Sequence, residues 1–312
     1  MSREPSLSRR RFISSIGVLG AASVAAGIDG FAIEPERVEV TANQLRSPHA
    51  LAGTDGALLA SGAKSPASLT FVQLSDLHLK RVAEHEQRVA QAVKEVDPEL
   101  LLITGDSIDD RRNLHLLDAF LALLDRDLPK YAILGNWEHA CRVNRERLRE
   151  VYAAHGCQLL VNESAVHEHD GRELLITGLD DLLEGRPRVA DALRGVEPRP
   201  DHLILAHCPE HRDVLRRTRP PSGNRFSGIS SDDAAELSRF DPCCVFSGHT
   251  HGGQVNLFGF APWCPKGSGP YVSGWYGDVR PALYVSRGIG TVTIPIRLGS
   301  APEIASFRWH LA

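Results

Sequence analysis

Residues 69–78 read LTFVQLSDLH, an apolar run followed at once by Ser75 and an Asp-x-His sequence. A short apolar run of this kind is typical of a buried β-strand. Asp76 and His78 are therefore expected just where that strand ends. The carboxyl ends of strands are where α/β sheets bind ligands.

The same combination of an apolar run and trailing polar residues recurs along the chain. The later runs end in Thr104-Gly105-Asp106, Gly135-Asn136-Trp137-Glu138-His139, Ala206-His207 and Ser247-Gly248-His249-Thr250-His251-Gly252-Gly253. Strands are predicted at 37–41, 69–74, 100–103, 131–134, 159–161, 174–176, 203–205, 245–246 and 284–285 and near the carboxyl end, and helices at 82–96, 114–124 and 142–155. This alternation predicts an α/β fold.

Carboxylate, amide and imidazole groups together are typical ligands for a pair of divalent metals such as Mn, Fe or Zn. Side chains two residues apart lie on one face of a regular strand, so Asp-x-His and His-x-His can reach the same ions. The glycines before Asp106, Asn136 and His249 allow a sharp turn and close approach. Alone, Gly-Asp is usually a turn and His207 a hydrogen-bonded core residue; the ordered set favours a metal site.

The composition is that of an ordinary globular protein, with 42% hydrophobic and 24% charged residues and a formal net charge of -4. This charge gives no reason to expect nucleic acid as an electrostatic partner.

The amino terminus resembles a twin-arginine export signal, because Arg9-Arg10-Arg11 precede an uncharged stretch at 12–28. We therefore expect export by the twin-arginine (Tat) machinery to the periplasm or the outer face of the cytoplasmic membrane or cell wall. The stretch is also just long enough to stay as a membrane anchor. The expected organisation is a signal or anchor at 1–30, an edge strand and linker at 31–67, and a catalytic domain at 68–312.

The ordered motifs from Phe71 to His251 resemble the calcineurin-like metallophosphoesterases. Their pattern is Asp-x-His, Gly-Asp, Gly-Asn-His-(Asp or Glu), a His, and Gly-His-x-His. The Gly-His-Thr-His-Gly-Gly-Gln block, the export signal and the Ser-Arg-Gly sequence around Arg287 resemble the YkuE/YaeI branch. The resemblance implies two facing mixed β-sheets flanked by helices, a four-layer sandwich.

The resemblance also implies the ligand sets. One metal would be held by Asp76, His78 and His251, the second by Asn136, His207 and His249, and Asp106 would bridge them. Trp137 departs from the family pattern, which has a His there that assists the leaving group. His139, two residues later, is expected to act as the leaving-group acid in its place.

A hydroxide held between the two metals would attack phosphorus. Asp180 or Asp181 is expected either to orient ligand histidines or to lie in a solvated loop. Residues 219–231 are a candidate lid. The aromatic residues of 258–275 would either hold a substrate group or pack the loop onto the body. Arg287 would either meet a phosphate or be structural.

The predicted function is hydrolysis of phosphate esters, as a phosphodiesterase or pyrophosphatase acting on an envelope lipid or wall phosphoester. Two alternatives stay open at this point. One is a mononuclear zinc amidase of the cell wall, and the other is a metal-bound binding protein without catalysis.

Overall fold

Two six-stranded mixed sheets make up the body of the protein in the computed structural model, which describes residues 29–46, 68–218, 228–277 and 279–310. The first sheet has the order β1-β12-β2-β3-β4-β5, formed by β1 (Glu39–Arg46), β12 (Glu303–His310), β2 (Ser68–Leu74), β3 (Leu100–Ile103), β4 (Lys130–Ala132) and β5 (Cys157–Leu159). The second has the order β10-β11-β9-β8-β7-β6, formed by β10 (Gly274–Tyr276), β11 (Ala282–Val285), β9 (Cys244–Ser247), β8 (Asp201–Leu205), β7 (Arg172–Gly178) and β6 (Glu163–His169).

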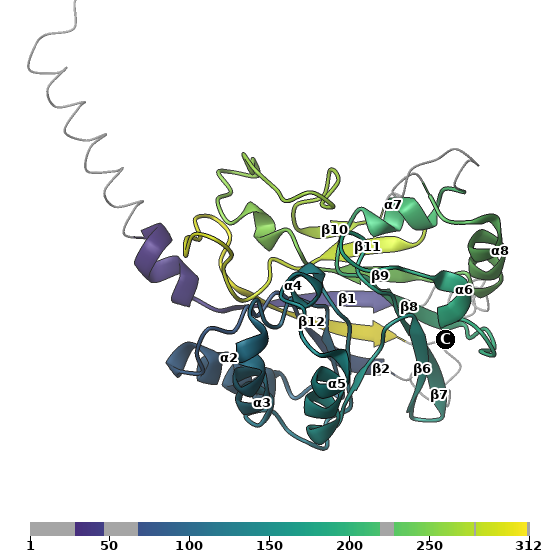
Figure 1. Ribbon diagram of the computed structural model, residues 1–312, viewed down its shortest axis with the longest axis horizontal. Helices are drawn as coiled ribbons and strands as arrows, with labels where there is room; N and C mark the ends of the chain where they lie inside the picture. Colours follow the sequence, from purple (N-terminus) through teal and green to yellow (C-terminus); the bar gives the residue numbers. More distant parts are fainter. Residues whose placement is uncertain (1–28, 47–67, 219–227, 278, 311–312) are drawn as a thin grey trace, which may run out of the picture.

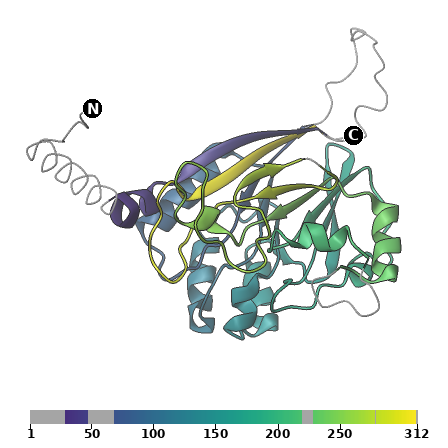
Figure 2. The ribbon, with the colours of Figure 1, turned by 90° about the horizontal axis from the view of Figure 1, so that it is seen from above.

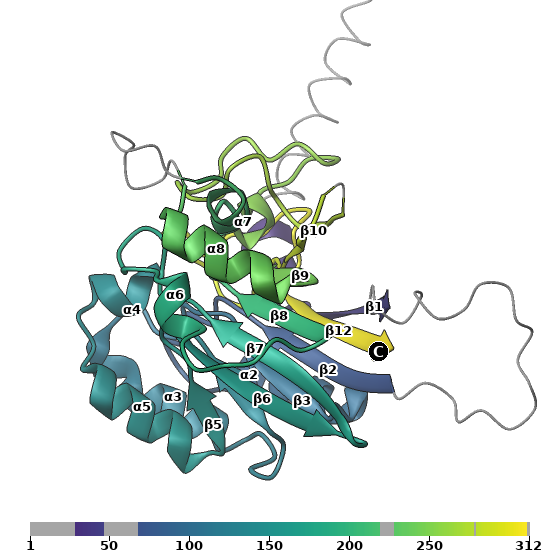
Figure 3. The same cartoon turned by 90° about the vertical axis from the view of Figure 1, so that its right-hand side faces the viewer.

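Helices cover the outer face of each sheet (Figures 1 and 3). The helices are α2 (Glu84–Val96), α3 (Leu114–Leu121), α4 (Asn136–Ala140), α5 (Arg145–Ala154), α6 (Val189–Ala192), α7 (His211–Leu215) and α8 (Ser231–Phe240), with short turns η1 (Asp29–Ile33), η2 (Glu34–Glu36), η3 (Arg111–Asn113) and η4 (His251–Gly253). α2, α3 and α5 pack under the first sheet, and α6, α7 and α8 pack on the second.

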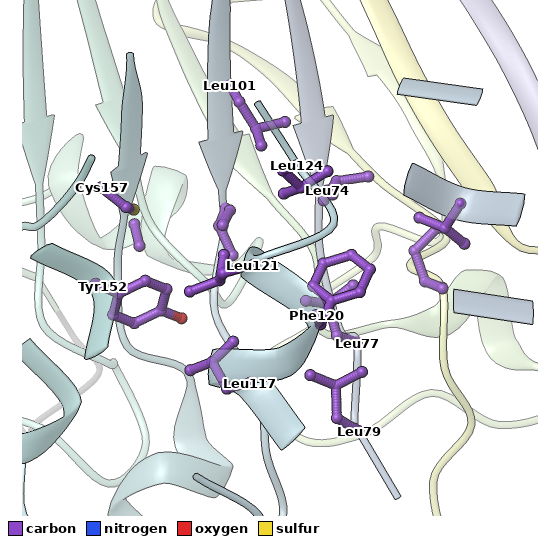
Figure 4. Close-up of a cluster of buried hydrophobic side chains, with 14 of the residues drawn as sticks. Leu74, Leu77, Leu79, Leu101, Leu117, Phe120, Leu121, Leu124, Tyr152 and Cys157 are labelled. Atoms are coloured by element: carbon purple, nitrogen blue, oxygen red, sulfur yellow. The ribbon is translucent and has the colours of Figure 1, made fainter. Parts of the chain in front are cut away.

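Strand β3 shows how the sequence produces these layers. Its four residues, Leu100 to Ile103, are all fully buried. Leu100 and Leu102 belong to the core between the two sheets, whereas Leu101 and Ile103 pack against the helices (Figure 4). A strand buried on both faces needs a continuous apolar run, because successive side chains point to opposite faces. The predicted α/β fold with two facing sheets is confirmed.

The first sheet places the two ends of the described chain side by side. β1 pairs in parallel with β12, and β12 pairs antiparallel with β2 (Figure 2). The edge strand expected at 37–41 exists but runs from Glu39 to Arg46, so Asn43–Arg46 is strand rather than linker. Regular pairing with β12 continues to Arg46, so β1 is longer than the alternating apolar and polar residues of its sequence indicated.

Some predictions fall on residues that the structure does not describe. These are the export signal at 1–28, the linker at 47–67 and most of the candidate lid at 219–231. Within the described parts of the chain, we find no helix with the length and apolar character needed to cross a bilayer.

Candidate metal centre

The predicted ligands lie in loops or turns that directly follow strands. Asp76 and His78 follow β2, Asp106 follows β3, Asn136 begins α4 after β4, His207 follows β8, and His249 and His251 follow β9. The first three of these strands belong to the first sheet and the last two to the second. The candidate centre therefore lies where the carboxyl ends of strands from both sheets meet.

Six of the seven predicted ligands form two buried groups. Asp76, His78 and His251 form the first group, and Asp106, His207 and His249 form the second. Within each group the candidate ligand atoms all lie within 4.8 Å of one another.

Asp106 lies between the two groups. Its Oδ2 is 3.0 Å from Nε2 of His207 in the second group and 3.7 Å from Nε2 of His78 in the first. A carboxylate in this position has the geometry that a bridging ligand needs.

The backbone reaches this arrangement in a way that strand geometry did not predict. β2 ends at Leu74, and Asp76 and His78 follow it with φ values of 53° and 43°. His249 and His251 also lie in the left-handed region, at 71° and 51°. The expectation that each pair shares one face of a strand is therefore wrong. Left-handed residues of this type are uncommon, and they cluster at functional sites where surrounding structure holds them.

Two glycines allow the close approach that was predicted for them. A Cβ atom at Gly135 would collide with the carboxylate of Asp106, and one at Gly248 would collide with the carboxylate of Asp76. Any side chain at these positions would push a predicted ligand away from its group.

Backbone carbonyls orient the histidines of the second group. His207 Nδ1 lies 2.8 Å from the carbonyl oxygen of Thr104, and His249 Nε2 lies 2.8 Å from that of Lys266. Because a carbonyl oxygen can only accept, each ring donates one N–H to it, and this contact turns the other ring nitrogen toward the group.

The first group is held less tightly. His251 Nδ1 lies 3.2 Å from the carbonyl oxygen of Gly290. His78 has no hydrogen-bond partner at either ring nitrogen, although it is buried. Its ring stacks on that of His251, with 5.0 Å between centroids, and meets Trp137 edge-on at 6.0 Å. Ring packing, rather than a hydrogen bond, therefore orients His78, with the Asp106 carboxylate 3.7 Å from its Nε2.

The unpaired polar atoms fit a metal. Oδ1 of Asn136, like both nitrogens of His78, is buried without a hydrogen-bond partner. Leaving such an atom unsatisfied costs roughly 1–3 kcal/mol, so a native site is expected to provide a partner. Asn136 lines the cavity together with Asp106 and His249, two members of the group to which the resemblance assigns it as a ligand.

Burial controls the charge state of these groups. Burial lowers the pKa of His78 and of His251 well below the usual value, and lowers that of His249 to about 4. Burial acts against protonation of His207 too, but the Asp106 carboxylate outweighs it and raises the His207 pKa well above its usual value. Neutral imidazole is the form that binds a metal, so three of the four histidines are already in that form at neutral pH.

A cavity of about 260 Å³ lies over the ligands. Asp106, Asn136, His249 and His251 line it. Its apolar walls are contributed by Trp137, Leu183, Trp263, Pro265 and Val292. Trp137, which replaces the usual family His, therefore stands in the cavity, but its indole N–H is a donor that does not titrate.

His139 is not among the residues that line this cavity. Its Nε2 lies 2.6 Å from Oδ1 of Asp180, and this hydrogen bond raises the His139 pKa. The charge state suits an acid, but the position does not bring the ring to the ligands. Its role as leaving-group acid stays a prediction.

The expectation that Asp180 or Asp181 orients a ligand histidine is wrong for the contacts observed. Asp180 accepts hydrogen bonds from His139 and from backbone amides. Asp181 accepts from the backbone amides of Leu183 and Glu184, so it caps a turn. Three of the ligand histidines, His207, His249 and His251, use backbone carbonyls instead.

Sequence reasoning gave Glu138 no role, yet it holds two ligand loops together. Its buried carboxylate accepts the backbone N–H groups of Asp106 (3.1 Å), Ser107 (2.7 Å), Ile108 (3.2 Å) and Gly135 (2.9 Å). Burial raises its pKa to about 7. Its place in the Gly-Asn-x-Glu motif was the available signal.

Arg297 is a second residue that sequence reasoning missed. It is fully buried, and its guanidinium donates to the carbonyl oxygens of Arg287 (3.0 Å), Gly288 (3.0 Å), Gly290 (2.6 Å) and Ser300 (2.8 Å). The amide of Gly290 in turn donates to the carbonyl of Asp76 at 2.7 Å. Arg297 therefore supports the first group from behind, and no motif marked it.

Arg287 takes the structural role. Its Nη2 lies 3.1 Å from Glu39 and its Nε lies 3.7 Å from Glu303, so both carboxylates compete with any phosphate.

Two of the aromatic residues of 258–275 pack the loop onto the body, which is one of the two roles expected for them. Tyr271 is buried, and Trp275 packs against the core ring of Phe246.

The profile of the calcineurin-like phosphoesterases matches residues 69–253, which span all seven predicted ligands. The chain belongs to this family. It is a metallophosphoesterase with two buried Asp/His groups suited to a dinuclear metal centre. Two groups of ligands and this membership exclude the mononuclear amidase alternative.

Several proteins are similar to this metallophosphoesterase over three quarters or more of its length. It is 28% identical to the uncharacterized metallophosphoesterase YkuE of Bacillus subtilis, over 96% of this chain and 97% of that protein. It is 26% identical to the uncharacterized metallophosphoesterase YkoQ of the same organism, over 76% and 82%. It is 24% identical to the UDP-2,3-diacylglucosamine pyrophosphatase LpxG of Chlamydia muridarum, over 94% and 96%. The similarity to YkuE agrees with the branch predicted from the sequence.

Proposed function

We propose that this metallophosphoesterase hydrolyses a phosphodiester or pyrophosphate that carries an apolar group, on an envelope lipid or a wall polymer. The observation that carries the proposal is the cavity, which is lined by metal-ligand side chains together with Trp137, Leu183, Trp263 and Val292. Apolar walls next to a charged reaction centre suit a substrate that is part phosphate and part hydrocarbon. The similarity to a pyrophosphatase of a diacylated sugar nucleotide supports the same substrate class.

The residues of the chain divide the chemistry among them. Asp76, His78 and His251 would hold one metal, Asn136, His207 and His249 the other, and Asp106 both. When bound, the metals supply Lewis-acid charge that neutralises phosphoryl oxygens and makes water a nucleophile at neutral pH.

The surrounding side chains prepare the site for that chemistry. Glu138 keeps the loops of Asp106 and Gly135 in register through four backbone hydrogen bonds. Trp137 contributes apolar surface to the cavity lining. Apolar surroundings lower the local dielectric, which would strengthen the attraction between a phosphate and the centre.

His139 is the proposed proton donor to the leaving group, supported by its raised pKa beside Asp180. The test compares His139→Ala on a p-nitrophenyl phosphodiester and on an alkyl phosphodiester. A good leaving group needs little protonation, so the alkyl substrate should suffer more. Equal losses on both substrates would remove His139 from the mechanism.

Export by the Tat pathway to the periplasm or the outer membrane face or wall is part of the proposal. It is supported by Arg9, Arg10 and the uncharged stretch at 12–28. Changing both arginines to lysine should retain the protein in the cytoplasm, as measured by fractionation. Unchanged export would contradict this part alone.

The substrate is tested with a panel. Purified protein loaded separately with Mn, Fe or Zn is assayed on bis-p-nitrophenyl phosphate, p-nitrophenyl phosphate, a diacylated sugar nucleotide and a wall polymer diester. We expect diester or pyrophosphate turnover to exceed monoester turnover, with Asp106→Asn as the inactive control. A fully metal-loaded protein that hydrolyses none of these would overturn the proposal.

A further inference from the structure

The exposed apolar side chains of the described residues are concentrated in one place. Of ten large apolar side chains that are exposed there, seven lie in three segments, residues 29–33, 254–263 and 292–296. The seven are Phe31, Ile33, Leu257, Phe258, Phe260, Trp263 and Ile294. We call these three segments the apolar rim. Phe258 at its tip is fully exposed, and Phe260 and Trp263 are each about two-thirds exposed, at 68% and 64%.

The three segments are held together by hydrogen bonds, either directly or through Arg297 and Leu298, which follow directly after 292–296. The amide of Asn256 donates to the carbonyl of Leu298 at 2.7 Å, and the amide of Val292 donates to Oε1 of Gln254 at 2.7 Å. The amide of Arg297 donates to the carbonyl of Gly30 at 2.8 Å. Figure 1 shows the purple turn η1 beside the yellow loop that holds 292–296.

The rim is also nearly free of charge. Asp29 is the only charged residue in the three segments, in a chain of which 24% is charged. Exposed apolar surface of this kind on one face marks an interaction site rather than ordinary surface.

The rim adjoins the candidate centre. Trp263 and Val292 belong to the rim and also line the cavity over His249 and His251. Whatever covers the rim therefore lies next to the entrance of the reaction site.

We propose that the apolar rim inserts into the interface of a lipid bilayer, so that the phosphoester reaches the metal centre from the membrane. Only the second part of this proposal, that the substrate comes from the membrane, rests on the proposed function. The uncharged stretch at 12–28 leads directly into η1, where Phe31 and Ile33 are exposed, so the most apolar part of the sequence ends at the rim. A tryptophan at the border of such a surface suits the headgroup region of a bilayer.

The shape of the rim favours a lipid surface over a protein. A protein interface pairs its apolar core with polar and charged residues around it that make hydrogen bonds. Phe258, Phe260 and Trp263 instead project from one uncharged loop, 254–263, in which Leu257 and Phe260 form the closing bridge. Apolar side chains that project from an uncharged loop can enter the boundary between headgroups and acyl chains without burying a charge. The affinity for the bilayer then increases with the apolar area that is buried.

The test uses the full chain, loaded with metal, and vesicles of phosphatidylcholine and phosphatidylglycerol whose acyl chains carry bromine. Bromine quenches tryptophans that enter the bilayer. Trp263 is the most exposed of the four tryptophans, while Trp309 is buried and Trp137 and Trp275 are half-buried. With these vesicles, the fluorescence that comes from Trp263 should be quenched in the wild-type protein. The Trp263→Phe variant should not show this quenching.

Two double variants complete the test. For Phe258→Ser with Phe260→Ser, the lipid concentration that gives half-maximal quenching of Trp263 should rise at least about tenfold, because two large apolar side chains no longer contact the bilayer. Leu123→Ser with Val166→Ser is the matched control, since these side chains are exposed but lie outside the rim. The control should behave as the wild type does.

Three results would overturn the proposal. They are vesicle binding without quenching, no binding, and a stable dimer that does not bind vesicles, which would make a second copy the partner.

Failure of the membrane proposal can be distinguished from failure of the proposed function. Phe258→Ser with Phe260→Ser should keep the turnover of soluble bis-p-nitrophenyl phosphate and lose turnover of a vesicle-borne phosphoester. Absence of turnover in the wild-type protein would contradict the function and leave the quenching result standing.

Discussion

The two ligand groups differ in how the protein holds them. In the second group, His207 and His249 each meet a backbone carbonyl at 2.8 Å. In the first, His251 meets a carbonyl at 3.2 Å and His78 meets none. The second group is therefore arranged by the backbone before a metal binds, whereas the first depends on packing and on the metal itself. One centre thus combines a preorganised half and a half completed by its ion.

The largest effect is expected where the two groups join. Asp106→Asn removes a carboxylate that lies within 4 Å of both His78 and His207, so the bridge loses its charge. Turnover of bis-p-nitrophenyl phosphate should fall more than about 100-fold, beyond the usual cost of losing an outer-shell partner. Turnover is measured beside the metal content per chain. If Asp106→Asn kept wild-type turnover, the bridging role would be wrong.

A second change should affect the first group alone. Arg297→Met removes the donor to the carbonyls of Gly288 and Gly290, which support Asp76 and His251. Metal affinity at the first group should fall about 10–100-fold, as for other supporting contacts. Calorimetric titration should show one weakened and one unchanged site. Arg297→Lys, which keeps a charge, is the control, and equal weakening of both sites would show that Arg297 does not act on one group.

A third pair of changes tests the difference without metal. In metal-free protein, His207→Leu should lower the free energy of unfolding by roughly 1–3 kcal/mol, because the Thr104 carbonyl and Asp106 lose a partner. His78→Leu should be neutral or stabilising, because it removes two unsatisfied buried nitrogens. Urea unfolding after chelation measures both. A larger loss for His78→Leu would reverse the comparison.

The smallest effect concerns the pair His139 and Asp180, which lies outside both groups. The hydrogen bond to Asp180 raises the His139 pKa, so its contribution to stability is complete below about pH 6.5 and is lost as pH rises through the folded value. Burial acts against ionisation of Asp180, but the hydrogen bond from His139 leaves its pKa lowered. Its contribution is therefore lost only as pH falls through that lowered value. His139→Gln should cost on the order of 1 kcal/mol at pH 6 and less at pH 9. The same loss at both pH values would show that the pair carries no charge-dependent stability.

The parts of the fold that the sequence predicted are those with strong apolar patterns. The run at 100–103 became β3 with the same bounds. β6 was missed because its sequence ESAVHEH is polar and mostly half-buried at the edge of the second sheet. α8 was missed because its apolar face is short and follows a stretch rich in Pro, Gly and Ser.

The candidate site follows the same division. Residues at the ends of apolar runs were found, because strand ends converge in α/β sheets. Glu138 accepts backbone amides of the Asp106 loop that are 30 to 32 residues away, so its motif alone did not reveal its role. Arg297 donates to carbonyls three to ten residues away in an irregular segment, and no motif marks it. The left-handed backbone of Asp76 and His78 also depends on neighbouring loops: the amide of His78 donates to the carbonyl of Asp106 at 3.0 Å.

The position of β12 has a consequence for synthesis of the chain. This strand, Glu303–His310, lies between β1 and β2, although both of those precede it by more than two hundred residues. While the ribosome is still adding residues, β1 has no neighbour and β2 lacks one of its two. The first sheet can be completed only after translation has reached β12, so folding is governed by contacts between distant segments and should be slow.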